Sequence, residues 1–271
     1  MRTGGLAGGG EARPAGCAEN GLQPGDGGRR GGKLTVVGIG PGSRDQITPR
    51  AERAIRDAQA VVGYDTYLDL LGDLIRDKEI HRSQMREEIE RCRLAVGLAL
   101  TGKRVAVVSS GDPGVYGMAG PILEVLGERG LAVEIIPGVT AATAAAAALG
   151  APLNHDFAVI SLSDLLTPWP VIEKRLAAAA TGDFVTVLYN PRSKKRREQI
   201  VRAREIFLKC RKETTPVGIV KNVSRESEEV VITNLRKMCE HPVDMLTTVI
   251  IGNSQTFVLS SYMITPRGYC L

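Results

Sequence analysis

The fold is decided at Leu34-Thr35-Val36-Val37-Gly38-Ile39-Gly40-Pro41-Gly42, where a short apolar run passes directly into a glycine loop. The residues before Gly38 are apolar or β-branched, which is typical of a strand buried on both faces. The glycines allow a sharp turn whose backbone is open to close approach by a ligand. Thr48 and Pro49 then predict the N-cap and first position of an amphipathic helix over residues 51–59. The stretch therefore predicts a strand, a ligand-permissive loop and a helix.

The same alternation continues along the chain and predicts an α/β fold. The strands of the first half are continuously apolar, so we expect them to be parallel and covered by helices. The later strands are joined by shorter connections, which predicts a mixed sheet in the second half. We expect strands at 60–62, 104–109, 133–136, 157–162, 184–188, 217–220, 230–232 and 247–251, and helices at 86–100, 121–128, 141–149 and 193–212.

Two α/β domains follow from this pattern, at residues 33–152 and 153–271, with the boundary after the Gly150-Ala151-Pro152 turn. Residues 1–32 are rich in glycine and lack apolar periodicity. We therefore expect them to form a disordered leader, because such a segment buries too little surface to offset its ordering entropy.

Composition excludes several classes of protein. Hydrophobic residues make up 43% of the 271 and charged residues 24%, as in globular proteins. No apolar run approaches the roughly 20 residues needed to cross a bilayer, so we expect a cytoplasmic protein without a membrane partner. The five cysteines are scattered without a Cys-x-x-Cys pair, and we assign no metal. The net charge of +5 suits either an anionic small molecule or RNA.

Two nucleotide-binding motifs are only superficially present. The glycine loop lacks the third glycine of a dinucleotide fingerprint, because Ser43 stands there, and Pro41 has no N–H to offer a pyrophosphate. The run from Gly97 to Lys103 resembles a P-loop, but Arg104 replaces the required Ser or Thr and the run precedes a strand. Both motifs are therefore rejected.

Three strands of the first half end in turns that suit a ligand. Beside the Gly38 loop, the 104–109 strand ends at Ser109-Ser110-Gly111-Asp112-Pro113-Gly114, and the 133–136 strand at Pro137-Gly138 before an Ala-rich helix. Open α/β sheets bind ligands at the carboxyl ends of their strands, and helix N-termini offer free N–H groups. We expect the three turns to meet in one site.

These motifs, in this order and spacing, resemble the tetrapyrrole (corrin/porphyrin) methyltransferases over residues 33–271. The resemblance implies two α/β domains of the tetrapyrrole methylase type with a cofactor cleft between them. Four further segments are similar to the ring-contracting corrin branch of the family. They lie at 63–67, 117–120, 155–169 and 189–193. Val223-Ser224 departs from the pattern, in which smaller residues are expected.

The resemblance implies S-adenosylmethionine as cofactor and a homodimer. Its implied reaction is methylation of C17 of precorrin-3B, or of its cobalt counterpart cobalt-factor III, with ring contraction in cobalamin biosynthesis. The cofactor residues carried over are Pro41, Ser110, Gly111, Asp112, Val115, Tyr116, Thr140, Ala141, Asn190, Val223, Gly252 and Asn253.

Four further residues are candidates by chemistry. Arg192 and Lys194 begin the basic segment after Asn190, where cations can bind the carboxylates of a macrocycle. Ring contraction also needs proton transfers, for which His155 and Asp45 are hypothetical acid and base residues. Each also has a structural interpretation, because a histidine at a strand start is commonly structural and Asp45 stands beside a helix start.

Other functions remain open at this point. One alternative lies in the same superfamily, either a uroporphyrinogen methyltransferase or a ribosomal RNA 2′-O-ribose methyltransferase. For the latter, the basic segment would contact RNA and binding would weaken steeply with salt. Another alternative is a catalytically silent tetrapyrrole carrier, which would lack affinity for the cofactor. We favour the corrin enzyme, with a tetrapyrrole substrate and no nucleic-acid partner.

Overall fold

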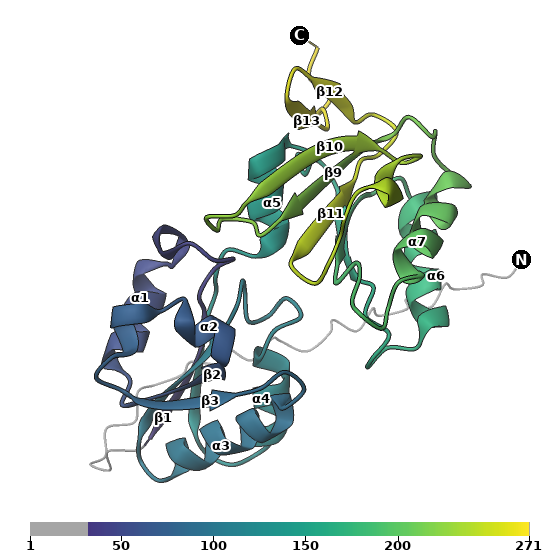
Figure 1. The fold of residues 1–271 in the computed structure, drawn as a ribbon. Helices are drawn as coiled ribbons and strands as arrows, with labels where there is room; N and C mark the ends of the chain where they lie inside the picture. Colours follow the sequence, from purple (N-terminus) through teal and green to yellow (C-terminus); the bar gives the residue numbers. More distant parts are fainter. Residues whose placement is uncertain (1–31, 271) are drawn as a thin grey trace, which may run out of the picture. The chain divides into compact units, whose positions relative to one another are not determined.

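The computed structural model describes residues 32–270, so the segment predicted to be a disordered leader lies outside the described residues except for Gly32. Within that range the chain forms two five-stranded sheets with flanking helices and a smaller three-stranded sheet (Figure 1). The α/β class predicted from the sequence is confirmed.

The first sheet is entirely parallel, with strand order β3-β2-β4-β1-β5. Its strands are β1 (Lys33–Gly38), β2 (Ala60–Tyr64), β3 (Glu79–Ser83), β4 (Arg104–Ser109) and β5 (Ala132–Ile136). Its helices are η1 (Arg44–Gln46), α1 (Pro49–Asp57), α2 (Asp65–Asp69), η2 (Gly72–Ile75), α3 (Glu88–Leu100) and α4 (Ala119–Leu126). The Thr48 hydroxyl accepts a hydrogen bond from the Ala51 N–H at 3.2 Å, as expected of an N-cap.

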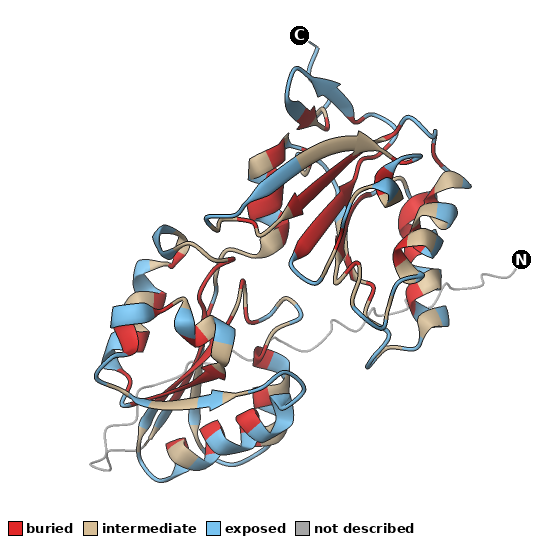
Figure 2. Ribbon diagram, viewed as in Figure 1, coloured by how far each residue is buried: buried red, intermediate tan, exposed pale blue. Residues whose placement is uncertain are grey.

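Both faces of the central strands β2, β4 and β1 are buried, which explains why these strands are continuously apolar. Val36 packs with α3 and α4 on one face, and its neighbour Val37 packs with α1 and η2 on the other. Successive side chains of a strand point to opposite faces, so every position of β1 after Lys33 is buried (Figure 2). The order of the strands places β4, β1 and β5 side by side, and with them the three turns singled out in the sequence.

The second sheet is mixed, as predicted, with order β10-β9-β11-β8-β7. Strands β7 and β8 are parallel, whereas β11 runs antiparallel to both β8 and β9. Its strands are β7 (Phe157–Ser161), β8 (Val185–Tyr189), β9 (Pro216–Lys221), β10 (Glu229–Asn234) and β11 (Thr247–Ile251). Its helices are α5 (Ala141–Leu149), α6 (Trp169–Thr181), α7 (Gln199–Leu208) and η3 (Met238–Glu240).

Helix α5 packs against the second sheet although it directly follows the first. Its buried alanines share a core with Val187 of β8 and Ile250 of β11, and its small side chains allow the helix to lie close to the strands. The domain boundary near residue 152 stays a prediction. The packing of α5 favours a boundary that we propose at residues 137–140.

The basic segment is not one long helix. Residues 193–198 form a loop before α7, because the Ser193 hydroxyl and N–H bond the backbone of Arg196 and close a turn. The chain ends in a hairpin of β12 (Phe257–Leu259) and β13 (Tyr262–Ile264), which pairs with β6 (Gly150–Ala151). Neither the hairpin nor the break in the basic helix was predicted.

In residues 32–270, no helix is long and apolar enough to cross a membrane. The same range contains no group of three His, Cys, Asp or Glu side chains arranged to hold a metal ion. The cysteines placed there are free.

Candidate cofactor and substrate site

The three predicted turns meet at the carboxyl edge of the first sheet. Gly40 and Gly111 form an isolated antiparallel bridge, with N···O distances of 3.2 and 2.7 Å. A Cβ on Gly38 would lie 2.6 Å from the nitrogen of Gly138 and 2.7 Å from the oxygen of Gly111. Glycine is therefore required at Gly38 because backbone crosses backbone there, whereas the sequence had suggested approach by a ligand.

Asp112 holds two of these turns together. One carboxylate oxygen accepts the Gly114 N–H at 2.7 Å, and the other accepts the Gly138 N–H at 3.0 Å. A charged acceptor makes hydrogen bonds stronger than neutral ones. The acidic residue of the Gly-Asp-Pro turn thus fixes the shape of the site from within the first half.

Tyr189, at the end of β8, connects the second half to the start of α5. Its hydroxyl lies 2.6 Å from the Thr140 hydroxyl and accepts the Ala142 N–H at 2.7 Å. Burial raises the pKa of the Tyr189 hydroxyl, while the bonds to Thr140 and Ala142 act in the opposite direction. The phenol is therefore neutral at physiological pH and satisfies a free N–H of the helix start.

Tyr116 makes a second connection between the halves. Its backbone has a φ of 54°, in the left-handed region, which directs the side chain across to β7. The hydroxyl donates to the Val159 carbonyl and accepts the Ser161 N–H, each at 3.2 Å. The Tyr116 ring meets the Tyr189 ring edge to face, with centroids 6.0 Å apart. Two tyrosines thus form an aromatic wall where the halves meet.

Arg225 crosses the glycine loop from the second half. Its Nε donates to the Pro41 carbonyl at 3.4 Å, and its stem passes so close to Gly42 that a Cβ there would lie 2.5 Å from its Cγ. Next to it, the Ser224 hydroxyl bonds the Gln46 side chain at 3.0 Å. A Cβ at Gly42 would therefore displace the Arg225 side chain.

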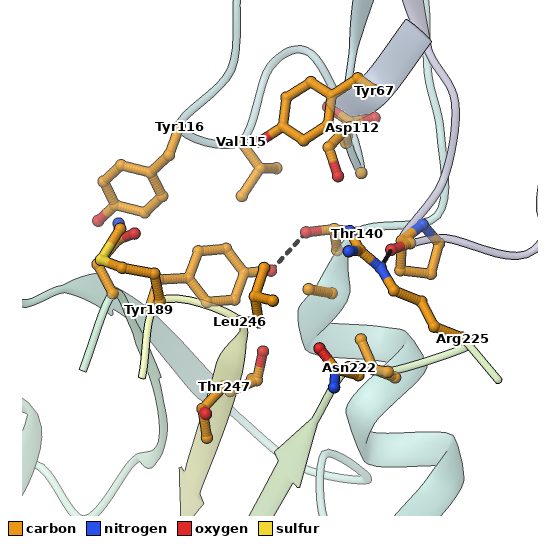
Figure 3. A pocket seen from close by; sticks show the side chains of 18 residues that line it. Tyr67, Asp112, Val115, Tyr116, Thr140, Tyr189, Asn222, Arg225, Leu246 and Thr247 are labelled. Carbon is orange, nitrogen blue, oxygen red and sulfur yellow. Dashed lines mark hydrogen bonds between the residues drawn. The ribbon is translucent and has the colours of Figure 1, made fainter. Parts of the chain in front are cut away.

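These elements enclose a pocket of about 200 Å³, which we call the cofactor pocket (Figure 3). Its lining includes ten of the residues that the resemblance implied: Pro41, Ser110, Gly111, Asp112, Val115, Tyr116, Thr140, Ala141, Asn190 and Val223. It also includes residues that were not predicted: Tyr67, Tyr189, Asn222, Arg225, Met245, Leu246, Thr247 and Thr248.

Gly252 and Asn253 do not line this pocket, and the direction of β11 explains why. The carboxyl ends of β8 and β9 reach the pocket, but β11 is antiparallel to both, so its amino end, Leu246-Thr247, lies there instead. Gly252 follows the opposite end of β11, and Asn253 lines a separate pocket that includes His155. The structure thus places the amino end of β11 at the pocket, and Gly252 and Asn253 away from it.

A larger pocket of about 660 Å³ adjoins the cofactor pocket; it is the candidate substrate site, and we call it the substrate pocket. The two share Tyr67, Tyr116, Asn190 and Met245. Burial raises the pKa of the Tyr67 hydroxyl, so it is a neutral group at this junction. The cations of the substrate pocket are Arg86, Arg91, Lys195 and Arg196, and its acidic residues are Glu88 and Asp164.

The other predicted site residues lie outside both pockets. Arg192 and Lys194 line a neighbouring pocket beyond Met245, so within the basic segment the substrate pocket receives Lys195 and Arg196 instead. His155 precedes the amino end of β7, whereas the carboxyl end of that strand, at Ser161, lies near the site. The Nδ1 of His155 is 3.4 Å from the Asp156 carboxylate. Asp45 lies in η1 and lines yet another pocket, which it shares with Ser224 and Arg225. These positions do not support the acid and base roles considered for His155 and Asp45.

The fold defines a class of α/β proteins with two five-stranded sheets and a pocket lined by residues from both. Comparison makes the class specific: residues 33–239 match Tetrapyrrole (Corrin/Porphyrin) Methylases, and the chain belongs to this family. Over 88% of its length it is 52% identical to "Cobalt-factor III methyltransferase" of Priestia megaterium and 51% identical to "Probable cobalt-factor III C(17)-methyltransferase" of Salmonella typhimurium. It spans 45% of the first relative and 100% of the second.

Solved structures agree with these relatives. The crystal structure of the methyltransferase CobJ superimposes with a TM-score of 0.83 at 40% identity, covering 87% of this chain and 100% of that one. Uroporphyrin-III C-methyltransferase from Thermus thermophilus, solved with S-adenosyl homocysteine, gives a TM-score of 0.65 at 25% identity, covering 82% of this chain and 97% of that one. The family predicted from the glycine motifs is confirmed.

Proposed function

We propose that the chain is an S-adenosylmethionine-dependent methyltransferase that methylates C17 of cobalt-factor III, with ring contraction, in cobalamin biosynthesis. The observation that carries this function is 51% identity spread over the whole length of a relative of that name. The segments that carry the resemblance, Gly111-Asp112-Pro113 and Tyr189-Asn190, both contribute residues to the cofactor pocket.

The cofactor pocket fits S-adenosylmethionine by its chemistry. Turn backbone, the Thr140 and Thr247 hydroxyls and the Asn190 amide offer polar contacts to a nucleoside and an amino acid, while Val115 and Leu246 offer apolar ones. The structural neighbour solved with S-adenosyl homocysteine supports the same ligand. Bound there, the cofactor supplies an electrophilic methyl group.

The role of the protein in such a transfer is mainly positioning. Methyl transfer needs the reacting atoms at about 3–3.5 Å in line, a geometry that a rigid site provides without further ordering. Tyr116 and Asn190 line both pockets, and hydrogen bonds hold both side chains to Ser161. We infer that they keep the ring carbon of the substrate against the cofactor pocket and help to exclude water.

The alternatives are less well supported. The Thermus uroporphyrin-III enzyme is 25% identical, against 51% for the Salmonella relative. A silent carrier would not need a cofactor pocket, and so would have no need of the ordered Gly-Asp-Pro turn that lines it. An RNA-binding role would depend on the basic segment as a continuous helix face, but residues 193–198 form a turn. We propose that nucleic acid is not a partner.

The test is anaerobic incubation with labelled S-adenosylmethionine and either cobalt-factor III or precorrin-3B, followed by mass and absorption spectra of the product. We expect one methyl group per macrocycle, a ring-contracted chromophore, and faster turnover of cobalt-factor III. A methylated product with an intact ring would contradict ring contraction. Faster turnover of precorrin-3B would reassign the substrate, and no methylation of either would refute the function.

We also propose a homodimer in the cytoplasm. The β12–β13 hairpin exposes Phe257, Val258, Leu259 and Tyr262 without any charged residue, which is typical of a surface that pairs with another chain. Light scattering should give twice the chain mass, and a Leu259→Lys substitution should lower it. Cell fractionation tests the location.

A further inference from the structure

Arg91 is a buried cation in the lining of the substrate pocket. It lies at the end of the first turn of α3 and is 5% exposed. Its Nε donates to the Ser83 hydroxyl at 2.6 Å, one Nη donates to the Gln84 carbonyl at 3.1 Å, and the other lies 3.5 Å from the Met118 sulfur. All of these partners are neutral. Within residues 32–270, no carboxylate lies within ion-pair distance of Arg91.

A buried charge without a counter-charge is unfavourable, and buried arginines are normally paired with acids. Arg211 shows the usual arrangement in this protein. Its side chain is also buried, but Asp183 lies 3.6 Å away, three backbone carbonyls accept its N–H groups, and it stacks on Phe207. Arg211 lines neither the cofactor pocket nor the substrate pocket. Arg91 differs in lacking an acid and in facing a pocket.

Arg196 occupies a comparable position in the second half. It bonds the Ser163 hydroxyl at 3.4 Å and the Asn190 carbonyl at 3.1 Å, and lies 3.3 Å from the Met245 sulfur. Its Nε is buried without a partner among the described residues. Burial lowers the pKa of this guanidinium, and Asp164 opposes the shift. Arg196 is thus a second desolvated cation whose hydrogen bonds go to neutral groups.

The acidic residues of the substrate pocket do not neutralise either arginine. The Glu88 carboxylate accepts the backbone N–H of Arg86 at 3.2 Å, and the Asp164 carboxylate accepts the side-chain amide of Gln199 at 2.8 Å. Neither forms an ion pair with Arg91 or Arg196 in the described part of the chain. The four cations of the lining outnumber its two carboxylates, so an anionic ligand would provide the partners that Arg91 and Arg196 lack.

We propose that Arg91 and Arg196 are carboxylate-binding sites contributed by the two halves, and that together they fix the in-plane rotation of the macrocycle. A corrin precursor carries carboxylates around its rim, and a guanidinium can bind each one with two parallel hydrogen bonds. Holding two of them would select which ring carbon faces the cofactor pocket. This inference rests on the proposed function for the identity of the macrocycle, but not for the anionic character of the ligand.

The experiment measures binding of uroporphyrin III, an octacarboxylate, to the full chain by fluorescence quenching, with its octamethyl ester as the uncharged probe. Arg91→Met and Arg196→Met should each weaken uroporphyrin binding by about thirtyfold or more, the loss typical when one partner of a buried charge pair is removed. Affinity for S-adenosyl homocysteine, measured in parallel, should stay unchanged. The ester should bind weakly to every variant.

Exposed arginines close in sequence to each site provide controls. Arg93 on α3 is exposed beside Glu90, and Arg202 on α7 is exposed beside Glu205, so Arg93→Gln and Arg202→Gln should bind uroporphyrin like the parent. Arg91→Met removes an unpaired buried charge, so without ligand its unfolding free energy should equal or exceed that of the parent protein. A purely structural arginine would give a loss of stability. Arg91→Lys keeps the charge, so its binding loss should be smaller than that of Arg91→Met.

Unchanged uroporphyrin binding in Arg91→Met and Arg196→Met would overturn the proposal, as would equal binding of the octamethyl ester. If Arg91→Met does not fold, Arg91→Lys takes its place. Uroporphyrin binding by Arg91→Lys as tight as that of the Arg93→Gln control would then overturn the proposal for Arg91. With cobalt-factor III, both arginine variants should lower kcat as well as raise KM, because a rotated macrocycle presents another carbon. If the parent binds uroporphyrin through both arginines but does not methylate cobalt-factor III, the proposed function fails and the carboxylate sites stand.

Discussion

Gly38 stands where three backbone segments come into contact, so its lack of a side chain matters more than its flexibility. The nearest atoms to an added Cβ belong to the backbone of Gly111 and Gly138, which cannot rotate away as a side chain would. A methyl group at this position must therefore push apart the turns that form the cofactor pocket.

Gly38→Ala should lower the free energy of unfolding by about 1–3 kcal/mol, the usual cost of overpacking, and should weaken binding of S-adenosyl homocysteine at least tenfold. Urea unfolding and calorimetry measure the two effects. Gly97→Ala is the control, because a Cβ there meets no atom within 4 Å and alanine favours the helix. That variant should be at least as stable as the parent, and equal behaviour of the two variants would contradict the packing argument.

Tyr189→Phe should lower the free energy of unfolding by about 1–3 kcal/mol, because the Ala142 N–H at the start of α5 loses its acceptor inside the protein. The raised pKa gives a further expectation. A tyrosine that holds its proton more tightly when folded contributes stability below pH 10, and this is lost as pH rises through its folded pKa. Parent stability should therefore fall more steeply above pH 10 than that of Tyr189→Phe. Parallel curves would exclude this linkage.

At the scale of elements, β11 determines which residues reach the cofactor pocket. Because it runs antiparallel to β8 and β9, the turn before it contributes to the site. Asp244 holds this turn through the Leu246 N–H at 2.8 Å and the Thr247 hydroxyl at 2.9 Å. Burial alone raises the pKa of the Asp244 carboxyl, but these bonds and Lys221 together hold it below its usual range.

Asp244→Ala should therefore weaken S-adenosyl homocysteine binding several-fold and destabilise the protein by about 0.5–1 kcal/mol near neutral pH. A lowered pKa stabilises the fold above the ordinary value of 3.8 and loses this effect as pH falls through the folded value. The stability difference between parent and variant should shrink below pH 4. Urea titrations at pH 6 and pH 3 measure it, and a difference that grows toward acid would contradict the argument. Asp156→Ala, at an exposed carboxylate outside both pockets, is the control.

At the scale of the whole molecule, the cofactor pocket draws its lining from both sheets, so one ligand should stabilise both. At a hundred times its Kd, S-adenosyl homocysteine should raise the unfolding free energy by about 2.7 kcal/mol. Hydrogen exchange should show added protection in β1 and in β8 alike. Protection confined to β1 would mean that the second half unfolds without releasing the ligand.

Much of this architecture could be predicted because it is local in sequence. The strand and turn at Gly38 and the N-cap at Thr48 depend on neighbouring residues, and so their patterns are visible in the chain. The direction of β11 depends on pairing with β8 and β9, which no local pattern encodes, so nothing in the sequence singled out Thr247. Gly252 was instead carried over from the family resemblance. Arg91 looks like any helix residue until its burial and its lack of an acid are known.

The turn before β11 has a practical consequence for redesign. Met245 lines both main pockets and the neighbouring one that contains Arg192, and Leu246 separates the cofactor pocket from that same neighbour. Exchanging these two side chains would alter three cavities at once, while Asp244 still holds the turn and the start of β11. A library confined to Met245 and Leu246 is therefore a compact starting point for redirecting the enzyme toward unnatural macrocycles or alkyl donors.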